Sequence, residues 1–343
     1  MPKRDIIVIG ASAGGIDALQ RMVKGLPGNL QAAIFITVHI SPQGPALLAD
    51  ILTRAGSLPA VTSSDWEEVR MGHIYVAPPD RHLIIDPSGY TRVTRGPKEN
   101  RFRPAVDPLF RSAARAYGPR VTGVILTGGL DDGTAGLLAV KRRGGLAVIQ
   151  DPSDALVPSM PLNASEHVAI DYSLPLSEIA PLLVRLSEEG VEEEGEYPVS
   201  DELDIELKIA SENNALETGV MKLGEFSPFT CPECHGALLQ MKDAGLVRFR
   251  CHTGHAFSAN SLIAELTENI EDQLWTTIRS MQESTMLMRH MAEHLYEEGN
   301  GPMAELFLTK AHEADQRTDL IRQAVMNHEK MSKDKVERAM KKS

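Results

Sequence analysis

The sequence has few cysteines, few large aromatic residues and no long hydrophobic run. Its 343 residues include 3 Cys, 2 Trp and 6 Tyr. An odd number of cysteines, all within residues 231–251, argues against a disulfide framework. The scarcity of Trp and Tyr argues against a base-stacking surface, so no nucleic-acid partner is expected. No apolar stretch approaches the roughly 18 residues of a membrane span, so direct membrane insertion is not expected.

A secretory signal is also missing. The first apolar run, residues 6–9, ends at Gly10 and is too short for the core of a signal peptide. We therefore expect a cytoplasmic protein. Hydrophobic residues make up 42% of the chain and charged residues 24%, which is ordinary for a globular protein and leaves enough apolar side chains for a core.

Negative charge is concentrated in one segment. The formal net charge is -12, and residues 188–206 alone hold ten acidic residues and no basic one. Because like charges in a dense run repel each other, we expect an extended acidic linker over residues 186–225.

The first 185 residues alternate strand-like and helix-like patterns. The strand-like runs are continuous rather than alternating in polarity, as in residues 6–9, 32–38, 121–127 and 146–150. Such runs are typical of parallel strands covered on both faces. The sequence therefore predicts an α/β fold, a doubly wound, mostly parallel sheet, as a catalytic domain over residues 1–185.

A glycine-rich turn follows the first predicted strand and precedes a helix. It reads Gly10-Ala11-Ser12-Ala13-Gly14-Gly15. Ser12 stands where the dinucleotide-binding fingerprint G-x-G-x-x-G needs its second glycine, so the turn does not match a dinucleotide-binding site. The turn does match G-x-S-x-G, which exposes a nucleophilic hydroxyl next to the free N–H groups of a helix N-terminus. A purely structural turn is the alternative.

Two further polar groups follow predicted strands. His39 ends the second strand, and Asp131 and Asp132 follow the strand over 121–127. Ends of parallel strands share one edge of a sheet, so His39 can activate Ser12 if their strands are adjacent, and a carboxylate can orient the imidazole. An Asp-Asp-Gly turn is otherwise more often a helix N-cap.

These residues resemble the catalytic domain of the bacterial chemotaxis protein-glutamate methylesterases over about residues 1–185. The resemblance is carried by the runs 9–15, 38–42, 72–78, 103–107 and 123–128, with Asp132-Gly133. It implies hydrolysis of glutamate methyl esters on a methylated chemoreceptor or receptor-like helical protein, with release of methanol and, in many members, glutamine deamidation. By position, Ser12 corresponds to the nucleophile, His39 to the base and Asp132 to the carboxylate. No cofactor is implied for catalysis.

The sequence departs from the family pattern in three places. Members in the usual pathway carry a receiver domain before the esterase, whereas this sequence starts at the esterase strand, so phospho-aspartate control within the chain is not expected. Ala13 replaces a frequent Thr and Gly129 a frequent Met. The backbone N–H of either residue can still serve an oxyanion hole. Arg101 and Arg103 are candidates for meeting acidic receptor helices, with a solvated charged face as the alternative.

Four potential metal ligands lie within residues 226–258. Cys231 and Cys234 form C-x₂-C, and Cys251 and His255 form C-x₃-H. This Cys₃His set suits a structural Zn²⁺ without an open coordination position. His255 is preferred to His252 because Gly254 permits the turn that returns it to the metal; three free thiols are the alternative. The module resembles the extension of methylesterase homologues that lack a receiver.

The last segment, residues 259–343, predicts an α-helical hairpin and a frayed basic tail. Apolar residues recur every three or four positions before a break at residues 299–302. A stripe of methionines (Met281, Met286, Met288, Met291) favours hairpin core over a groove for a receptor-like partner or for dimerisation. Two other functions stay open for the whole chain: a non-catalytic signalling adaptor, and a serine esterase with another acyl substrate.

Overall fold

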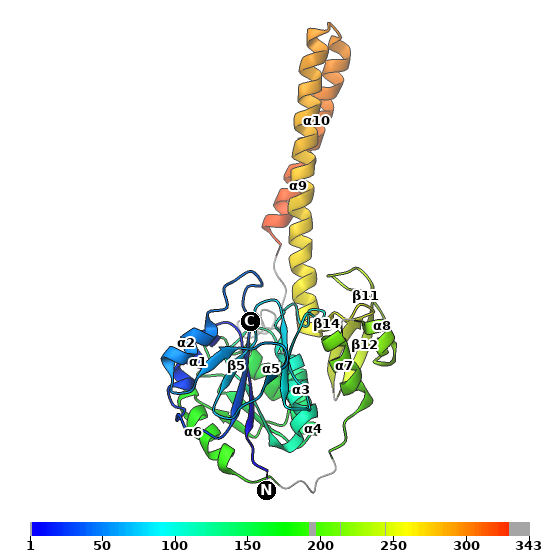
Figure 1. Cartoon of the computed structure of the whole chain (residues 1–343). Coiled ribbons are helices and arrows are strands. Elements are labelled where there is room, and N and C mark those ends of the chain that lie inside the picture. The colour runs from blue at the N-terminus through cyan, green and yellow to red at the C-terminus, as the bar shows by residue number, and fades with distance from the viewer. Residues whose placement is uncertain (1, 192–196, 213, 244, 329–343) are drawn as a thin grey trace. The chain divides into compact units, whose positions relative to one another are not determined.

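The chain forms two compact units in a computed structural model that describes residues 2–191, 197–212, 214–243 and 245–328 (Figure 1). The units are Met1–Ser261 and Leu262–Ser343. The predicted frayed tail falls within residues 329–343, outside the described residues.

A seven-stranded parallel sheet forms the centre of the first unit, in the order β10-β9-β8-β1-β2-β5-β3. Its strands are β1 (Ile6–Ala11), β2 (Ala33–Val38), β3 (Ala60–Thr62), β5 (Ile74–Val76), β8 (Val121–Ile125), β9 (Leu146–Gln150) and β10 (Tyr172–Leu174). Every residue of β1 and β2 is buried, which explains their continuous apolar sequence. The predicted doubly wound α/β fold is confirmed.

Helices cover both faces of this sheet, because alternate residues of each strand point to opposite sides. Ile7 and Ile9 pack into one core, and Ile6 and Val8 into the other. The first core is closed by α1 (Gly15–Val23), α2 (Leu48–Ala55) and α6 (Leu176–Glu188). The second is closed by α3 (Val106–Tyr117), α4 (Thr134–Arg142) and α5 (Ser159–His167).

A small antiparallel sheet joins the second core. It has the order β4-β7-β6, with β4 (Glu67–Glu68), β6 (His82–Ile85) and β7 (Tyr90–Thr94). Leu83 and Ile85 of β6 belong to the same buried cluster as α3. A 3-10 turn, η1 (Gly118–Arg120), links α3 to β8.

The expectation of an extended linker over residues 186–225 is wrong for much of that segment. It contains α7 (Asp201–Glu212), α8 (Ala215–Thr218) and the 3-10 turn η2 (Val220–Lys222). Residues 192–196, the densest part of the acidic run, lie outside the described residues. Helix α7 forms because it buries apolar residues and because arginines from other elements neutralise its acids; the buried apolar residues include Leu203, Leu207 and Ile209.

A buried ion network ties α7 to the catalytic domain. Glu206 is 3% exposed and accepts hydrogen bonds from Arg248 at 2.8 Å and Arg250 at 2.7 Å. Arg250 also donates to Glu99 at 3.2 Å, and Glu99 accepts from Arg111 of α3 at 2.5 Å. Burial opposes ionisation of Glu206, but the arginines hold its pKa well below the usual value. The charges are therefore paired within a buried interface.

A four-stranded antiparallel sheet, β11-β12-β13-β14, carries the predicted metal ligands. Its strands are β11 (Glu225–Thr230), β12 (Ala237–Asp243), β13 (Leu246–Cys251) and β14 (Ala256–Ser258). Leu239 and Met241 of β12 share a small core with Ile209 of α7 and Val220 of η2. The helices in the acidic segment thus supply part of the core of this sheet.

Two long helices follow, α9 (Ala259–Glu297) and α10 (Gly301–Met326). The break between them covers residues 298–300 and overlaps the predicted break at residues 299–302, whose last two residues begin α10. In the second unit, buried residues of α10 recur every seventh position: Ala304, Ala311, Thr318 and Val325. Small residues at heptad spacing favour close helix packing. The methionine stripe is only partly covered: Met286 is 63% exposed and Met291 42% exposed.

Within the described part of the chain, no helix is both long enough and apolar enough to cross a bilayer.

We expect Glu206→Ala to lower the free energy of unfolding by about 3–5 kcal/mol, because it leaves buried arginines without their counter-charge. Urea unfolding followed by circular dichroism measures the change. The exposed Lys208→Ala in the same helix is the control, with a change below about 0.5 kcal/mol. Since the folded-state pKa of Glu206 is lowered, its contribution should be complete above the unfolded pKa of about 4.3 and fade as the pH falls below it. Equal losses in the two variants would contradict a paired buried network.

Candidate active site

Three adjacent strands bring the predicted triad together. The order β8-β1-β2 places the strand before Ser12 between the strands before Asp132 and His39. Pairing continues one step past β2, because the His39 N–H donates to the carbonyl of Ala11 at 3.3 Å. The first two strands are adjacent, which is the condition for His39 to reach Ser12.

Ser12 sits in the turn between β1 and α1. Its backbone N–H donates to the carbonyl of Thr127 at 3.0 Å, which fixes the turn against the loop after β8. Gly14 caps α1 with a φ of 78°, a conformation that favours glycine. A Cβ on Gly128 would lie 2.8 Å from the Cβ of Ser12 and 2.1 Å from Met160 Sδ, so only glycine permits this approach.

His39 bridges the serine and the carboxylate. Its Nδ1 lies 3.0 Å from Ser12 Oγ, and its Nε2 lies 2.8 Å from Asp132 Oδ2. The His39 and Asp132 side chains are only 3% and 2% exposed. With an ionised Asp132, Nε2 carries the proton that it donates to the carboxylate, and Nδ1 is left as the base that faces Ser12.

Asp132 is held by donors from several elements. Besides His39, its Oδ2 accepts the Val106 N–H at 2.6 Å. Its Oδ1 accepts from Asn100 Nδ2 at 2.9 Å, the Gly133 N–H at 3.0 Å and the Asp107 N–H at 3.3 Å. This set of donors stabilises the ionised form and fixes the plane of the carboxylate.

The pKa values of the neighbouring carboxyl groups are shifted in different directions. Burial opposes ionisation of Asp132, but the hydrogen bonds from His39 and its other donors hold its pKa below the usual value. Burial, together with the negative charge of Asp132, raises the pKa of Asp107 to about 7. Burial likewise raises the pKa of Asp131 to about 6. Environments that separate the pKa values of nearby carboxyls assign the anionic role to Asp132.

A pocket of about 340 Å³ opens beside the imidazole, lined by residues that include His39, Pro42, Lys98, Arg101 and Phe102. The Phe102 ring stacks on His39 with centroids 3.7 Å apart and planes 8° from parallel. Arg103, the other candidate for meeting acidic receptor helices, also lines this pocket, but its guanidinium is held by Asp80 at 2.6 Å.

The predicted oxyanion donors directly follow Ser12 and Gly128 in the chain, and Gly128 is the residue that approaches Ser12. In the part of the chain that the structure describes, the N–H groups of Ala13 and Gly129 donate no hydrogen bond to protein acceptors. A Cβ on Gly129 would have no heavy atom within 4 Å, so its missing side chain leaves open space. Both amides are therefore available to a ligand.

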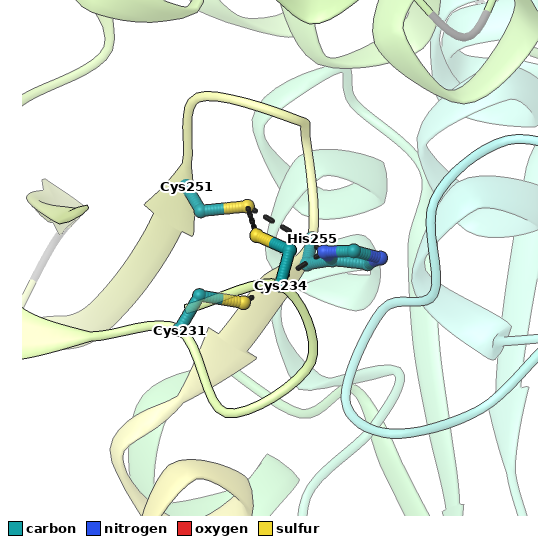
Figure 2. Close-up of side chains that lie close together, drawn as sticks. All are labelled: Cys231, Cys234, Cys251 and His255. Carbon is teal, nitrogen blue, oxygen red and sulfur yellow. Dashed lines mark hydrogen bonds between the residues drawn. The ribbon is translucent and has the colours of Figure 1, made fainter. Parts of the chain in front are cut away.

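The four predicted metal ligands converge at a second site. Their donor atoms all lie within 4.8 Å of one another, and the three sulfurs and the imidazole of His255 face each other (Figure 2). Cys234 Sγ is 3.7 Å from Cys251 Sγ, and His255 Nδ1 is 3.6 Å from Cys251 Sγ. Ligands of a tetrahedral zinc, at about 2.3 Å for sulfur and about 2.0 Å for nitrogen, lie about 3.5–3.8 Å apart. The cluster therefore fits this ion.

Two tight turns present these ligands. The Gly254 N–H donates to the Cys251 carbonyl at 2.9 Å, with a φ of 100° at Gly254. This is the turn for which we preferred His255. His252 instead packs against Gly236, where a Cβ would lie 2.1 Å from its ring. Among the described residues, the hydroxyl of Thr253 also touches the cluster, 2.9 Å from Cys251 Sγ.

Sequence reasoning missed Asn100 and Phe102. Both lie in a tight turn in which Glu99 pairs with Phe102, and Asn100 and Arg101 have φ values of 49° and 79°. Asparagine tolerates this left-handed conformation better than most residues, which is the one local signal that the sequence offered.

Comparisons with known proteins all lead to one family. Residues 7–183, just over half of the chain, match the family model described as CheB methylesterase. A Leptospira interrogans protein is 38% identical over 189 residues, covering 55% of this chain and 98% of that protein. The Anaeromyxobacter dehalogenans protein-glutamate methylesterase/protein-glutamine glutaminase 4 is 40% identical over 188 residues, covering 54% of this chain but only 52% of that protein. The solved catalytic domain of the Thermotoga maritima CheB methylesterase matches with a TM-score of 0.52 and 35% identity, covering 54% of this chain and 99% of that domain.

We expect Gly128→Ala to slow the labelling of Ser12 by a fluorophosphonate about 100-fold, because the new methyl group displaces the serine. Gly129→Ala is the matched control for the fold, since its methyl group enters open space, and its free energy of unfolding should change by less than about 0.5 kcal/mol. Mass spectrometry measures the labelling rate, and thermal unfolding tests the control. Unchanged labelling of Gly128→Ala would contradict the close approach.

Proposed function

Because this chain belongs to the CheB methylesterase family, we propose that it hydrolyses methyl esters of glutamate side chains on chemoreceptors and releases methanol. The contact chain from Ser12 through His39 to Asp132 carries this proposal. It supplies a nucleophile, a base and an orienting carboxylate, which acyl transfer requires.

In the first step, Ser12 Oγ attacks the ester carbonyl carbon while His39 Nδ1 takes the hydroxyl proton. The negative charge passes to the carbonyl oxygen, and the N–H groups of Ala13 and Gly129 would donate hydrogen bonds to it. The tetrahedral intermediate collapses with cleavage of the bond to the methoxy oxygen. His39 returns the proton to that oxygen, and methanol leaves.

In the second step, water attacks the acyl-enzyme, and His39 accepts one of its protons. Collapse releases the free glutamate carboxylate and regenerates Ser12. The same sequence on a glutamine side chain expels ammonia, so deamidation needs no further group. The two relatives compared above differ in length, and this chain spans about half of the Anaeromyxobacter protein. We therefore propose the receptor as the substrate and do not take it over from these relatives.

The metal site has a structural role in this proposal. Cys231, Cys234, Cys251 and His255 would hold Zn²⁺ with four protein ligands, which leaves no position for substrate. Bound zinc supplies cross-links that a small sheet with little core of its own needs. No catalytic step uses it.

We expect Ser12→Ala to abolish methanol release from methyl-labelled receptor membranes, a loss of at least about 10⁴-fold in kcat, since no other group replaces the nucleophile. Ser41→Ala is the matched control, because Ser41 lines the same pocket and, among the described residues, makes no hydrogen bond to the triad. Counting volatile label after a fixed incubation gives the rate.

The other outcomes separate the alternative functions. Labelling of Ser12 by a fluorophosphonate without methanol release would favour a serine esterase for another acyl substrate. Neither labelling nor release, from folded protein, would favour the signalling adaptor and would end the methylesterase proposal.

We expect the purified protein to contain about one zinc ion per chain, and His255→Ala to lose it. His252→Ala is the control and should keep the metal, because its ring packs on Gly236 rather than facing the sulfurs. Atomic emission gives the stoichiometry, and cobalt substitution should give the thiolate absorption of a tetrahedral site. Metal retained in His255→Ala and lost in His252→Ala would contradict the ligand set.

A further inference from the structure

The turn that carries Asn100 is held by the metal-binding module, residues 226–258. The Asn100 N–H donates to the carbonyl of Ala256 at 2.8 Å, and the Ala256 N–H donates to the carbonyl of Lys98 at 3.2 Å. Ala256 directly follows the ligand His255 and opens β14. A metal ligand is therefore one residue from the backbone pairing that fixes this turn.

The same turn is also held at the other half of the metal site. Lys98 Nζ lies 2.7 Å from Glu233, which stands between the ligands Cys231 and Cys234. A Cβ on Gly254 would lie 2.7 Å from Pro97, so the second ligand turn packs tightly against the chain just before Lys98. The segments that carry the two ligand pairs thus both contact residues 97–100.

The side chain of Asn100 joins the module to the catalytic carboxylate. Its Oδ1 accepts the Ser258 N–H at 2.9 Å and the Ser261 hydroxyl at 3.1 Å. Its Nδ2 donates to Asp132 and to Asp107, each at 2.9 Å. Two acceptor positions and two N–H donors are all occupied, so the amide has one favoured orientation.

A second link runs through Asp131. Its Oδ1 accepts the Ser258 hydroxyl at 2.6 Å, and its Oδ2 accepts Asn260 Nδ2 at 3.2 Å. Asp131 precedes Asp132 in the same loop. The segment after the metal ligands therefore touches both residues of this carboxylate pair, one directly and one through Asn100.

The turn reaches His39 as well. Phe102 ends the turn, pairs with Glu99, and stacks on the imidazole. Glu99 is fixed in turn by Arg250 of β13, one residue before the ligand Cys251. Displacement of this turn would therefore disturb two members of the triad at once.

We propose that the metal-binding module is a positioning element of the esterase, in which Asn100 transmits the metal-bound arrangement of β14 to Asp132 and His39. Metal occupancy then sets the turnover rate without the metal taking part in chemistry. The proposal rests on the function proposed above. Asn100 acts through Asp132 and does not itself contact the reacting atoms, so it is a positioning residue.

The test uses the full chain with zinc bound and after removal of zinc by a chelator. In the wild type, zinc removal should lower kcat for hydrolysis of 4-nitrophenyl acetate by about 10- to 100-fold, with KM changed by less than about threefold. Asn100→Gly deletes the amide while allowing the φ of 49°. It should show a similar loss with zinc bound, and little further loss when zinc is removed. The same change at the exposed Asn29, Asn29→Gly, should behave as the wild type does.

Three results would overturn the proposal. One is an unchanged kcat in the zinc-free wild type. Another is a kcat equal to that of the wild type in Asn100→Gly with zinc bound. Because this variant keeps its metal, its module stays folded, and its kcat reports the positioning by Asn100 alone. The third is an equal further loss on zinc removal in Asn100→Gly and in the wild type, because independent effects multiply.

A spectroscopic readout keeps this test apart from the proposed function. The His39 Nε2 proton shared with Asp132 should give a low-field proton resonance in the zinc-bound protein, and it should be lost or shifted on zinc removal and in Asn100→Gly. If the zinc-bound wild type hydrolyses no ester, the proposed function fails, and this resonance still decides the coupling. A resonance unchanged in both the zinc-free protein and Asn100→Gly would overturn it.

Discussion

The Asp132 carboxylate is the group on which the rest of the site depends. An ionised carboxylate at 2% exposure is costly unless its oxygens are hydrogen-bonded. Two of its donors are the Val106 and Asp107 N–H groups, which open α3. The N-cap of α3, Ala105, has no side chain to do this. Asp132 therefore caps α3 and orients a base with the same two oxygens, whereas the helix that follows its own turn, α4, has Gly133 as its N-cap and no side-chain cap.

The helix that Asp132 caps also connects the esterase to the segments that follow it in the chain. Helix α3 begins at Val106, whose N–H donates to Asp132, and its Arg111 enters the buried network with Glu99 and Glu206. The network continues into β13 through Arg250. Removing one partner of such a network lowers the free energy of unfolding by more than any one ion pair contributes, because the remaining charges stay buried without a partner. The ion network therefore makes α7 and the four-stranded sheet part of the first unit, although their sequence lies beyond the family match at residue 183.

The parts that sequence could predict are those that depend on short-range pattern. Continuous apolar strands and the motifs around Ser12, His39 and Asp132 sufficed for the fold class and the family, whereas the adjacency of β1 and β2 came from the structure. The spacing of the cysteines and His255 sufficed for the cluster of four. The prediction of an extended acidic segment failed because charge density alone predicts repulsion. Glu206 instead pairs with Arg248 and Arg250, which lie more than 40 residues later in the chain. Asn100 could not be found, because its role needs Ser258, which lies 158 residues later.

The orientation of His39 follows from the strand order. Neighbouring parallel strands lie about 4.8 Å apart, so a residue at the end of β2 is one strand from Ser12 and two strands from Asp132. Nδ1, nearer the backbone, meets the nearer partner, and Nε2, at the tip of the ring, reaches the farther one. The serine thus faces Nδ1, the reverse of the arrangement in the Ser-His-Asp proteases, where Nε2 meets the serine. The imidazole can turn about its bond to Cβ, and such a turn would carry both nitrogens away from their partners. The Phe102 ring covers one face of the imidazole, with the planes 8° from parallel, and opposes this turn, so a residue outside the hydrogen-bonded chain contributes to the geometry of the base.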